Sequence, residues 1–245
     1  MNESFKRQDI HNSNVPVICR SCEARHTGIC GVLDAGELTE LARHTRQVTH
    51  KSGDELVGEA TEITSYATIT SGVVKLAKTL RDGRQQVVGL QFAPDFLGRL
   101  FGEESRLTAE AVGEVSLCKL PRQALEAMIA ANPDLEHRIM LQTLRELDEA
   151  RDWMVTVGRK TAPEKVASFL CLIATHNNPT LADDDSNTTS FDLPLSRADI
   201  ADYLGLTIET VSRQFTKLRV DGVIKIVNNR HIEVPDLERL RERCG

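Results

Sequence analysis

Residues 196–220 carry the pattern that most restricts how this chain can fold, because it predicts two short helices on either side of a glycine. Ser196 and Asp199 have the spacing of a capping box, in which each side chain accepts a hydrogen bond from the other residue's backbone N–H at the helix N-terminus. Gly205 follows the first helix, where a turn needs the left-handed backbone that glycine adopts most readily. The second helix has one apolar face, formed by Val211, Phe215 and Leu218. We therefore expect a helix-turn-helix that packs through this face.

The opposite face of the second helix is polar and suits the reading of DNA. Glu209, Ser212 and Arg213 lie at i, i+3 and i+4 near its N-terminus, where a recognition helix meets base edges. Arginine can donate two hydrogen bonds to guanine, glutamate can accept one from cytosine N4, and serine can approach a base or a thymine methyl. Further DNA contacts are expected at Ser196, Arg197, Thr207 and Lys217. The alternative is a helical hairpin whose Glu209–Arg213 pair is merely solvated.

The segments around this motif complete a small domain. Residues 163–176 predict a buried helix with Pro163 in its first turn. Residues 177–190 are expected to form a polar loop. After the motif, residues 223–234 predict a hairpin that turns at Asn228-Asn229, in the position of a wing.

Cysteines mark the other end of the chain. Cys19, Cys22 and Cys30 follow the spacing C-x2-C-x7-C, and Cys118 stands far downstream. Four thiolates could hold an iron–sulfur cluster. With His26 as the fourth ligand, the triplet could instead form a compact zinc site. The spacing leaves both open, and Cys118 could also be a small buried core residue. Cys171, in an apolar helix, and Cys244, near the C-terminus, are interpreted as non-ligands.

Between these ends the pattern predicts a sheet followed by helices. Residues 1–31 show neither helical nor strand periodicity, so we expect an irregular segment that a ligand orders. A helix capped by Asp34 is expected over 34–45. From 48 to 120, short apolar runs alternate with glycine-containing turns, which is typical of a small antiparallel roll. Pro121 opens a short helix that stops near Asn132-Pro133.

Residues 134–158 predict one long helix whose apolar positions alternate at spacings of three and four, the pattern of a two-stranded coiled coil. These seam positions are Met140, Thr143, Leu147, Ala150, Met154 and Val157. We interpret the helix as a homodimer seam. The alternative is an amphipathic helix packed on its own domain.

Composition limits the other possibilities. The net charge of −6 does not favour indiscriminate binding to nucleic acid, although residues 208–231 hold five Lys or Arg against two acids. The sequence has no apolar run of 18 residues and its N-terminus has no apolar signal region. We therefore expect a cytoplasmic protein without a membrane partner, in which the thiols are free or bind metal.

With these motifs in place, the chain resembles the Crp/Fnr superfamily of transcriptional regulators, specifically the oxygen-responsive Fnr branch of the FnrN/FnrL type found in alphaproteobacteria. The resemblance covers residues 17 to about 240, and its most specific parts are the cysteine cluster, Cys118 within EVSLCKLP and the ETVSR run at 209–213. It implies an α+β fold. A cysteine-rich cluster-binding segment (1–31) would precede a cyclic-nucleotide-binding-like β-roll (32–133), a dimerisation helix (134–158) and a winged helix-turn-helix domain (159–245).

The resemblance also implies a mechanism. A [4Fe-4S] cluster on Cys19, Cys22, Cys30 and Cys118 would favour the dimer at low oxygen, and oxygen would destroy it. The dimer would bind palindromic TTGAT-N4-ATCAA-like sites through Glu209, Ser212 and Arg213 and activate anaerobic or microaerobic genes. RNA polymerase would be contacted through surface turns, with the Arg81–Arg84 turn as the candidate.

Two departures from the family pattern matter. Cyclic-nucleotide-binding relatives carry Gly-Glu-Leu and later Arg-Ser, whereas this chain has Gly98-Arg99-Leu100 and then Thr108-Ala109-Glu110. A cyclic nucleotide ligand is therefore not expected. The enteric Fnr pattern places an aspartate in the seam at Ala150, so the protein without a cluster is expected to dimerise more readily here, unless the flanking Asp148, Glu149 and Asp152 supply the same repulsion.

Other functions remain open at this point. The same regulator could sense through zinc or through thiol oxidation. A redox enzyme or electron carrier is disfavoured, because no dinucleotide-binding glycine motif and no nucleophile constellation accompanies the cysteines, so we expect no enzyme. A haem sensor would need a histidine pair, and His11, His26, His44 and His50 form no clear one.

Overall fold

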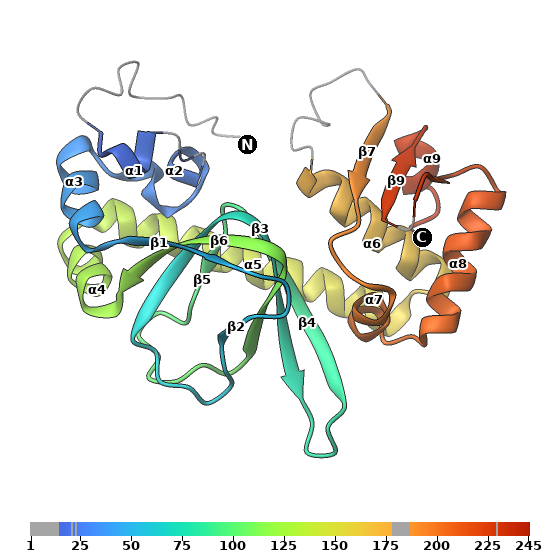
Figure 1. Cartoon of the computed structure of the whole chain (residues 1–245), viewed down its shortest axis with the longest axis horizontal. Coiled ribbons are helices and arrows are strands. Elements are labelled where there is room, and N and C mark those ends of the chain that lie inside the picture. Colours follow the sequence, from blue (N-terminus) through green and yellow to red (C-terminus); the bar gives the residue numbers. More distant parts are fainter. Residues whose placement is uncertain (1–14, 21, 23, 178–186, 229) are drawn as a thin grey trace. The chain divides into compact units, whose positions relative to one another are not determined.

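The computed structural model describes residues 15–20, 22, 24–177, 187–228 and 230–245 (Figure 1). The chain divides into two compact units. The first comprises Met1–Lys78 and Val88–Leu147, and the second comprises Thr79–Val87 and Asp148–Gly245. None of the described helices is both long enough and apolar enough to cross a lipid bilayer.

The first unit is built on a six-stranded sheet, which confirms the predicted roll. Its strands are β1 (Arg46–His50), β2 (Glu55–Val57), β3 (Ser65–Thr79), β4 (Gln85–Phe92), β5 (Phe96–Leu97) and β6 (Thr108–Pro121). The order is β1-β6-β3-β4, with β2 also on β6 and β5 also on β3. β6 is therefore the central strand, and it is paired antiparallel with β1, β2 and β3.

Helices cover one end of this roll. They are α3 (Ala35–His44), α4 (Arg122–Ala131) and the first part of α5 (Pro133–Arg159), close to the predicted bounds. Asp34 caps α3 as predicted, in a reciprocal capping box with Glu37. Leu38 and Leu41 of α3 are buried in an apolar core that Leu125, Leu135 and Ile139 of the later helices share.

The segment before α3 differs from the prediction. Instead of irregular chain, the described part contains three short helical turns, α1 (Val17–Arg20), α2 (Ala24–Thr27) and a 3-10 turn, η2 (Ile29–Val32). Turns of four residues are too short to show apolar periodicity, so the sequence pattern could not reveal them. Packing holds the segment in place, because Val15, Ile29 and Leu33 are buried in the core shared with α3, α4 and α5.

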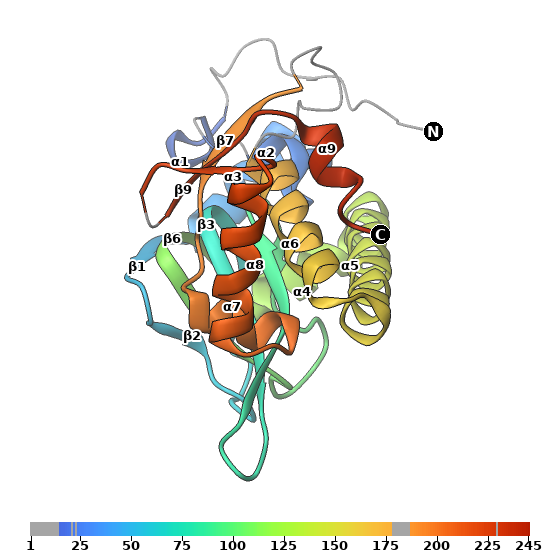
Figure 2. The ribbon, with the colours of Figure 1, turned by 90° about the vertical axis from the view of Figure 1, so that its right-hand side faces the viewer.

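The second unit is a winged helix-turn-helix (Figure 2). Its elements are α6 (Ala162–Asn177), β7 (Thr189–Asp192), α7 (Arg197–Leu204), α8 (Ile208–Val220), β8 (Lys225–Ile226), β9 (His231–Val234) and α9 (Leu237–Arg241). Helix α6 packs against both α8 and α9. Its buried side chains include Val166, Phe169, Leu170 and Ile173, as its apolar sequence predicted.

Two details of this unit depart from the sequence analysis. The polar loop predicted over 177–190 is wrong at its end, because β7 begins at Thr189 and pairs with β9 through Thr189 opposite Val234. The wing is thus a three-stranded sheet of order β7-β9-β8. At the wing turn, the Asn228 side-chain oxygen accepts hydrogen bonds from the backbone N–H groups of Arg230 (2.9 Å) and His231 (2.7 Å). Asn229 lies outside the described residues.

Candidate cysteine site and DNA-facing helix

The four cysteines singled out by the sequence line one small cavity of about 30 Å³. Cys19 comes from α1, Cys22 from the chain after it and Cys30 from η2, whereas Cys118 comes from the central strand β6. On β6, Cys118 pairs with Gln47 of β1 and Thr68 of β3, both of which also line the cavity. The fold therefore brings together residues that are about 90 positions apart in the chain.

The thiols are close without forming a ready-made metal site. Among the described residues, no three His, Cys, Asp or Glu side chains are already arranged to hold a metal ion. His26, the alternative fourth ligand for zinc, does not contribute to the described wall of the cavity, and its Nε2 lies 3.1 Å from the Arg25 guanidinium. This arrangement favours Cys118 over His26 as the fourth donor.

Burial favours the protonated form of three of these thiols, those of Cys19, Cys30 and Cys118. It raises the pKa of Cys118 to about 11 and the pKa of Cys30 further still, and the neighbouring cysteines add to both shifts. The pKa of Cys19 is also raised, first by burial and then by Cys22, while the nearby Arg25 opposes the shift. A neutral thiol is a poor nucleophile, so these cysteines are unsuited to direct reaction with oxidants. A bound cation would favour the thiolate form of all of them at once.

Hydroxyl groups complete the wall. The Thr45 side chain hydrogen-bonds to Cys118. The Thr68 hydroxyl is buried and has no hydrogen-bond partner among the described residues, although it opens onto the same cavity. A buried hydroxyl without a partner costs about 1–3 kcal/mol. Thr68 is therefore placed to donate to an acceptor inside the cavity.

The cysteine segment is fastened to the long helix α5. The Arg138 guanidinium, only 7% of the residue being exposed, donates hydrogen bonds to the carbonyl oxygens of Gly28 (3.3 Å) and Thr27. Directly after Gly28, the Ile29 side chain is buried in the same apolar core as Leu135 and Ile139 of α5. The backbone that carries Cys30 is thus connected to α5 by both polar and apolar contacts.

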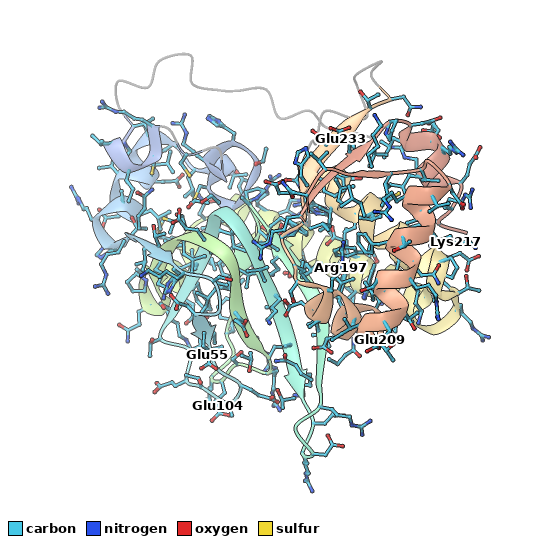
Figure 3. The ribbon with its side chains drawn as sticks, turned by 45° about the vertical axis from the view of Figure 1, so that its right-hand side comes forward. Glu55, Glu104, Arg197, Glu209, Lys217 and Glu233 are labelled. Atoms are coloured by element: carbon cyan, nitrogen blue, oxygen red, sulfur yellow. The ribbon has the colours of Figure 1, made fainter. Side chains whose placement is uncertain are left out.

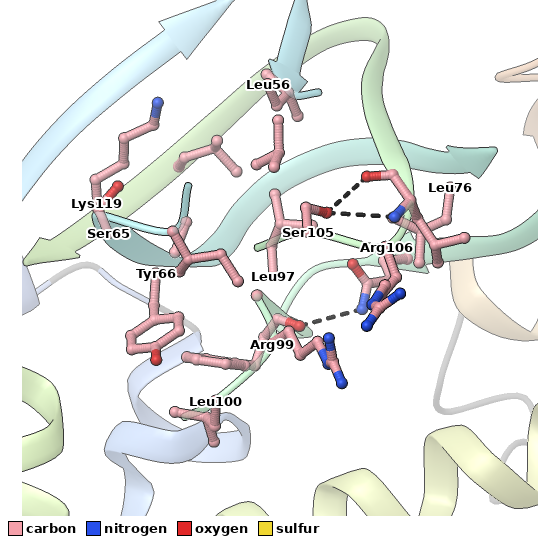
Figure 4. Close-up of a pocket in the computed structure, with 18 of the residues that line it drawn as sticks. Leu56, Ser65, Tyr66, Leu76, Leu97, Arg99, Leu100, Ser105, Arg106 and Lys119 are labelled. Carbon is pink, nitrogen blue, oxygen red and sulfur yellow. Dashed lines mark hydrogen bonds between the residues drawn. The ribbon is translucent and has the colours of Figure 1, made fainter. Parts of the chain in front are cut away.

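A second, larger cavity of about 600 Å³ lies in the roll (Figure 4). Arg99, Ser105 and Arg106 are on its wall, and the Ser105 hydroxyl donates to the Leu107 carbonyl oxygen (2.6 Å). Sequence comparison with the Arg-Ser motif considered residues 108–110 and missed Arg106, which precedes that stretch. The Ser105-Arg106 pair, which has the motif's two residue types in reverse order, was the signal that could have pointed to it. The absence of a cyclic nucleotide ligand stays a prediction.

The turn between α7 and α8 has the local chemistry expected from its sequence. The Ser196 and Asp199 side chains form the predicted capping box, with the Ser196 oxygen accepting from the Asp199 N–H at 3.1 Å. Gly205 adopts φ of 62° and ψ of 43°, the left-handed conformation. Thr207 caps α8 by accepting a hydrogen bond from the Thr210 N–H (3.3 Å). The caps set where each helix begins, so the exposed face of α8 is determined locally.

The predicted base-reading residues share this exposed face. Glu209, Ser212 and Arg213 are exposed, whereas Val211 and Phe215 are buried as expected. Glu209 does not pair with Arg213, whose guanidinium lies 3.5 Å from the Thr210 hydroxyl. Hydrogen bonds from the Glu209 backbone N–H and the Thr207 side chain lower the pKa of the Glu209 carboxyl. Glu209 is thus an exposed, ionised acceptor near the N-terminus of α8, with Lys217 farther along it (Figure 3).

Arg197 has a packing role that its sequence did not suggest. Its guanidinium lies 3.5 Å from the centre of the Phe215 ring, a cation–π contact that joins α7 to α8. Burial lowers the pKa of this guanidinium. A DNA contact from Arg197 stays a prediction. Contacts from Ser196, Thr207 and Lys217, which are all exposed, also stay predictions.

Helix α5 carries exposed apolar side chains at the positions proposed for a seam. The exposed fractions are 53% for Met140, 43% for Leu147 and 74% for Met154, and Thr143 and Ala150 are also exposed. Val157 is only partly exposed. The structure adds Leu144 and Val155, which the spacing rule passed over although they are 49% and 57% exposed. Between the seam positions Ala150 and Val157, the Trp153 ring stacks on Tyr203 of α7 at 4.0 Å between centroids.

Comparison with known proteins decides the family. The sequence profile of the Crp-like helix-turn-helix domain matches residues 164–243, and that of the cyclic nucleotide-binding domain matches residues 47–132. A probable transcriptional activator from Rhizobium leguminosarum bv. viciae is 53% identical over 96% of this chain and 96% of its own length. The transcriptional activator protein FnrL of Cereibacter sphaeroides is 38% identical over 94% of each chain. The chain belongs to the Crp/Fnr family.

Solved structures agree with this assignment. The structure of FixK2 from Bradyrhizobium japonicum superposes with a TM-score of 0.73 at 31% identity, over 82% of this chain and 98% of that one. The nitrogen fixation regulation protein FixK of Bradyrhizobium diazoefficiens is 41% identical over 86% of this chain and 87% of its own. This Crp/Fnr member is therefore a transcriptional regulator of the Fnr branch with a DNA-binding domain, and not an enzyme.

Proposed function

We propose that this Crp/Fnr regulator senses oxygen through a [4Fe-4S] cluster held by Cys19, Cys22, Cys30 and Cys118. The observation that carries the proposal is the convergence of these four thiols on one cavity, from the N-terminal turns and from β6. Family membership alone does not support a cluster, because the names of relatives such as FnrL and FixK do not state whether each protein binds one.

The donor types around the cavity match such a group. Four thiolates are the donor set that iron–sulfur clusters take. The unpartnered Thr68 hydroxyl faces the cavity, where a cysteine sulfur or an inorganic sulfide would accept its hydrogen bond. When bound, the cluster would supply an oxygen-labile cross-link between the cysteine segment and the roll.

The signal would then reach the dimer through α5. Cysteine ligation would restrain the backbone of residues 19–30, and Arg138 and Ile29 connect that backbone to α5. The exposed apolar side chains of α5, Met140 and Leu147 among them, would form the seam with a second copy. Losing the restraint would weaken the seam. A change of a few kcal/mol in dimer stability would be enough to switch specific DNA binding, because only the dimer presents two recognition helices.

DNA recognition would follow from α8. Two helices placed about 34–36 Å apart would read the two halves of a palindrome, one helical turn of DNA apart. In each half of a TTGAT-N4-ATCAA-like site, Arg213 would donate to guanine and Glu209 would accept from cytosine. Bound there, the dimer would activate transcription in the cytoplasm at low oxygen, with RNA polymerase as a partner. The Arg81–Arg84 turn is a candidate contact, in which Arg84 forms an exposed ion pair with Asp82 (2.8 Å).

Purification without oxygen tests this proposal. The expected protein is brown, contains about four iron and four sulfide per chain, and bleaches in air. Cys118→Ser should lose the iron and the tight binding to the TTGAT palindrome. Cys171→Ser is the matched control, since Cys171 is not among the residues that line the cavity, and it should keep both. A colourless, air-stable zinc protein would support the alternative of zinc sensing and overturn the iron–sulfur assignment.

A further inference from the structure

The two cysteines that the cavity does not use lie together in the second unit. Cys171 is on α6 and Cys244 follows α9, yet their sulfur atoms are 3.3 Å apart. They are separated by 73 positions in the chain, so only the packing of α6 against α9 brings them together. Both side chains are partly exposed, and both are free thiols. Small reagents in solvent can therefore reach the pair.

The surroundings of the pair distinguish the two sulfurs. The Cys171 and Cys244 sulfurs are in hydrogen-bond contact, in which either thiol can donate to the other, the Ser168 side chain also hydrogen-bonds to Cys244, and the cations Lys160 and Arg241 lie nearby. The Lys160 ammonium in turn donates to the Ser168 oxygen (2.9 Å). The acid that faces this end of the chain is Glu164, which lies beside Gly245. The protonated Cys244 thiol can donate to the Leu240 carbonyl oxygen at 3.5 Å. Once Cys244 is ionised, Ser168 and the two cations stabilise its thiolate, and the Cys171 thiol 3.3 Å away can donate to it.

We propose that Cys171 and Cys244 form a peroxide-reactive dithiol, with Cys244 as the nucleophile and Cys171 as the resolving thiol. The Cys244 thiolate would attack the O–O bond of a hydroperoxide, which leaves as an alcohol or water after taking a proton, and Cys244 becomes a sulfenic acid. The Cys171 sulfur would then attack the Cys244 sulfur. The S–O bond breaks, the hydroxyl leaves with the Cys171 proton as water, and an intrachain disulfide remains. Two thiols are oxidised by two electrons and one peroxide bond is reduced.

The geometry allows the second step with a small movement. A disulfide needs an S–S distance of about 2.05 Å, so the sulfurs must approach by about 1.3 Å. Cys244 lies beyond the last turn of α9, where the backbone is not part of a helix or strand. The cysteines of the cavity differ from this pair, because burial raises the pKa values of Cys30 and Cys118 and so disfavours their thiolates. The dithiol is therefore chemically distinct from the proposed cluster site.

Reactivity should follow the charge state of Cys244. Its pKa is lowered to about 7, first by the hydrogen bond with Cys171 and then by Ser168 and the two cations, while burial opposes the shift. A lowered pKa favours the thiolate above that pH, so the rate of reaction with peroxide should rise with pH and level off above 7. Near neutral pH the folded protein should therefore hold more Cys244 thiolate than an unfolded chain does, and the lower basicity of that thiolate offsets part of the gain in rate.

The test is peptide-level mass spectrometry of the full chain after treatment with hydrogen peroxide, with and without reductant. The expected product is a reducible cross-linked peptide pair that contains Cys171 and Cys244. Cys171→Ser should trap a sulfenic acid on Cys244, which dimedone labels, and Cys244→Ser should leave Cys171 unlabelled. Ser168→Ala removes one hydrogen-bond partner of Cys244 and leaves both cysteines in place, so it should slow the labelling of Cys244.

Three results would overturn the proposal. These are labelling of Cys171 in preference to Cys244, disulfides between chains in place of the intrachain pair, and a Cys244 rate no faster in the folded protein than in urea. The cluster proposal does not depend on any of them, since its own test follows Cys118 in anaerobic protein. Failure of one proposal would therefore leave the other standing.

Discussion

Replacing Arg138 by methionine would separate the cysteine segment from α5 while leaving the ligands intact. Methionine keeps an unbranched apolar stem but lacks the N–H groups that donate to the Gly28 and Thr27 carbonyl oxygens. Each hydrogen bond from a charged donor contributes about 1.5 kcal/mol at the low end of its range, so losing two costs about 3 kcal/mol. This corresponds to a shift of about 150-fold in the equilibrium between a docked and an undocked segment.

Hydrogen exchange measured on peptides covering residues 24–32 would report that shift directly. Exchange in the protein without a cluster should accelerate by about two orders of magnitude, provided that docking limits it. With the cluster bound, sedimentation should show a weaker dimer for Arg138→Met at unchanged iron content. Arg145→Met is the matched control, because Arg145 is an exposed arginine on the same helix. If Arg138→Met and Arg145→Met exchange equally slowly, Arg138 does not hold the segment and the proposed route to α5 is refuted.

Three further outcomes are expected. Arg213→Lys should weaken binding to the TTGAT palindrome by about 1–3 kcal/mol and reduce discrimination at the guanine, as measured by fluorescence anisotropy. An equal loss of affinity on all sequences would mean that Arg213 contacts only phosphate. Thr68→Val removes an unpartnered buried hydroxyl, so it should stabilise the cluster-free protein by about 1–3 kcal/mol in urea unfolding. It should also lower the reduction potential of the cluster in a redox titration. A destabilised cluster-free variant would show that the hydroxyl is already bonded. Ala150→Asp should weaken dimerisation of the cluster-free protein by sedimentation, and equal weakness in both proteins would rule out a role for Ala150 in the seam.

The accuracy of the sequence predictions followed the distance over which each signal acts. Capping residues such as Ser196 and Asp34, and the turn at Gly205, act within a few positions, and the structure has all three as expected. The long helix also appeared within a residue of its predicted ends. Errors arose where packing overrides a short local pattern. The turns of residues 17–32 and the strand β7 each consist of only a few residues, and neighbours far along the chain hold them in place.

For the sites, the sequence by itself determined which residue types were present and which lay near each other along the chain. It determined the thiol triplet ending at Cys30 and the polar face of α8 with Glu209 and Arg213, because spacing of three to eleven positions is enough to place such groups together. Only the tertiary structure decided that Cys118 faces the triplet, that Arg138 holds the backbone before Cys30, and that Cys171 meets Cys244. The physical reason is that these contacts join distant segments. Strand pairing on β6 and the packing of α5, α6 and α9 create them, and no local periodicity records which distant segments will meet.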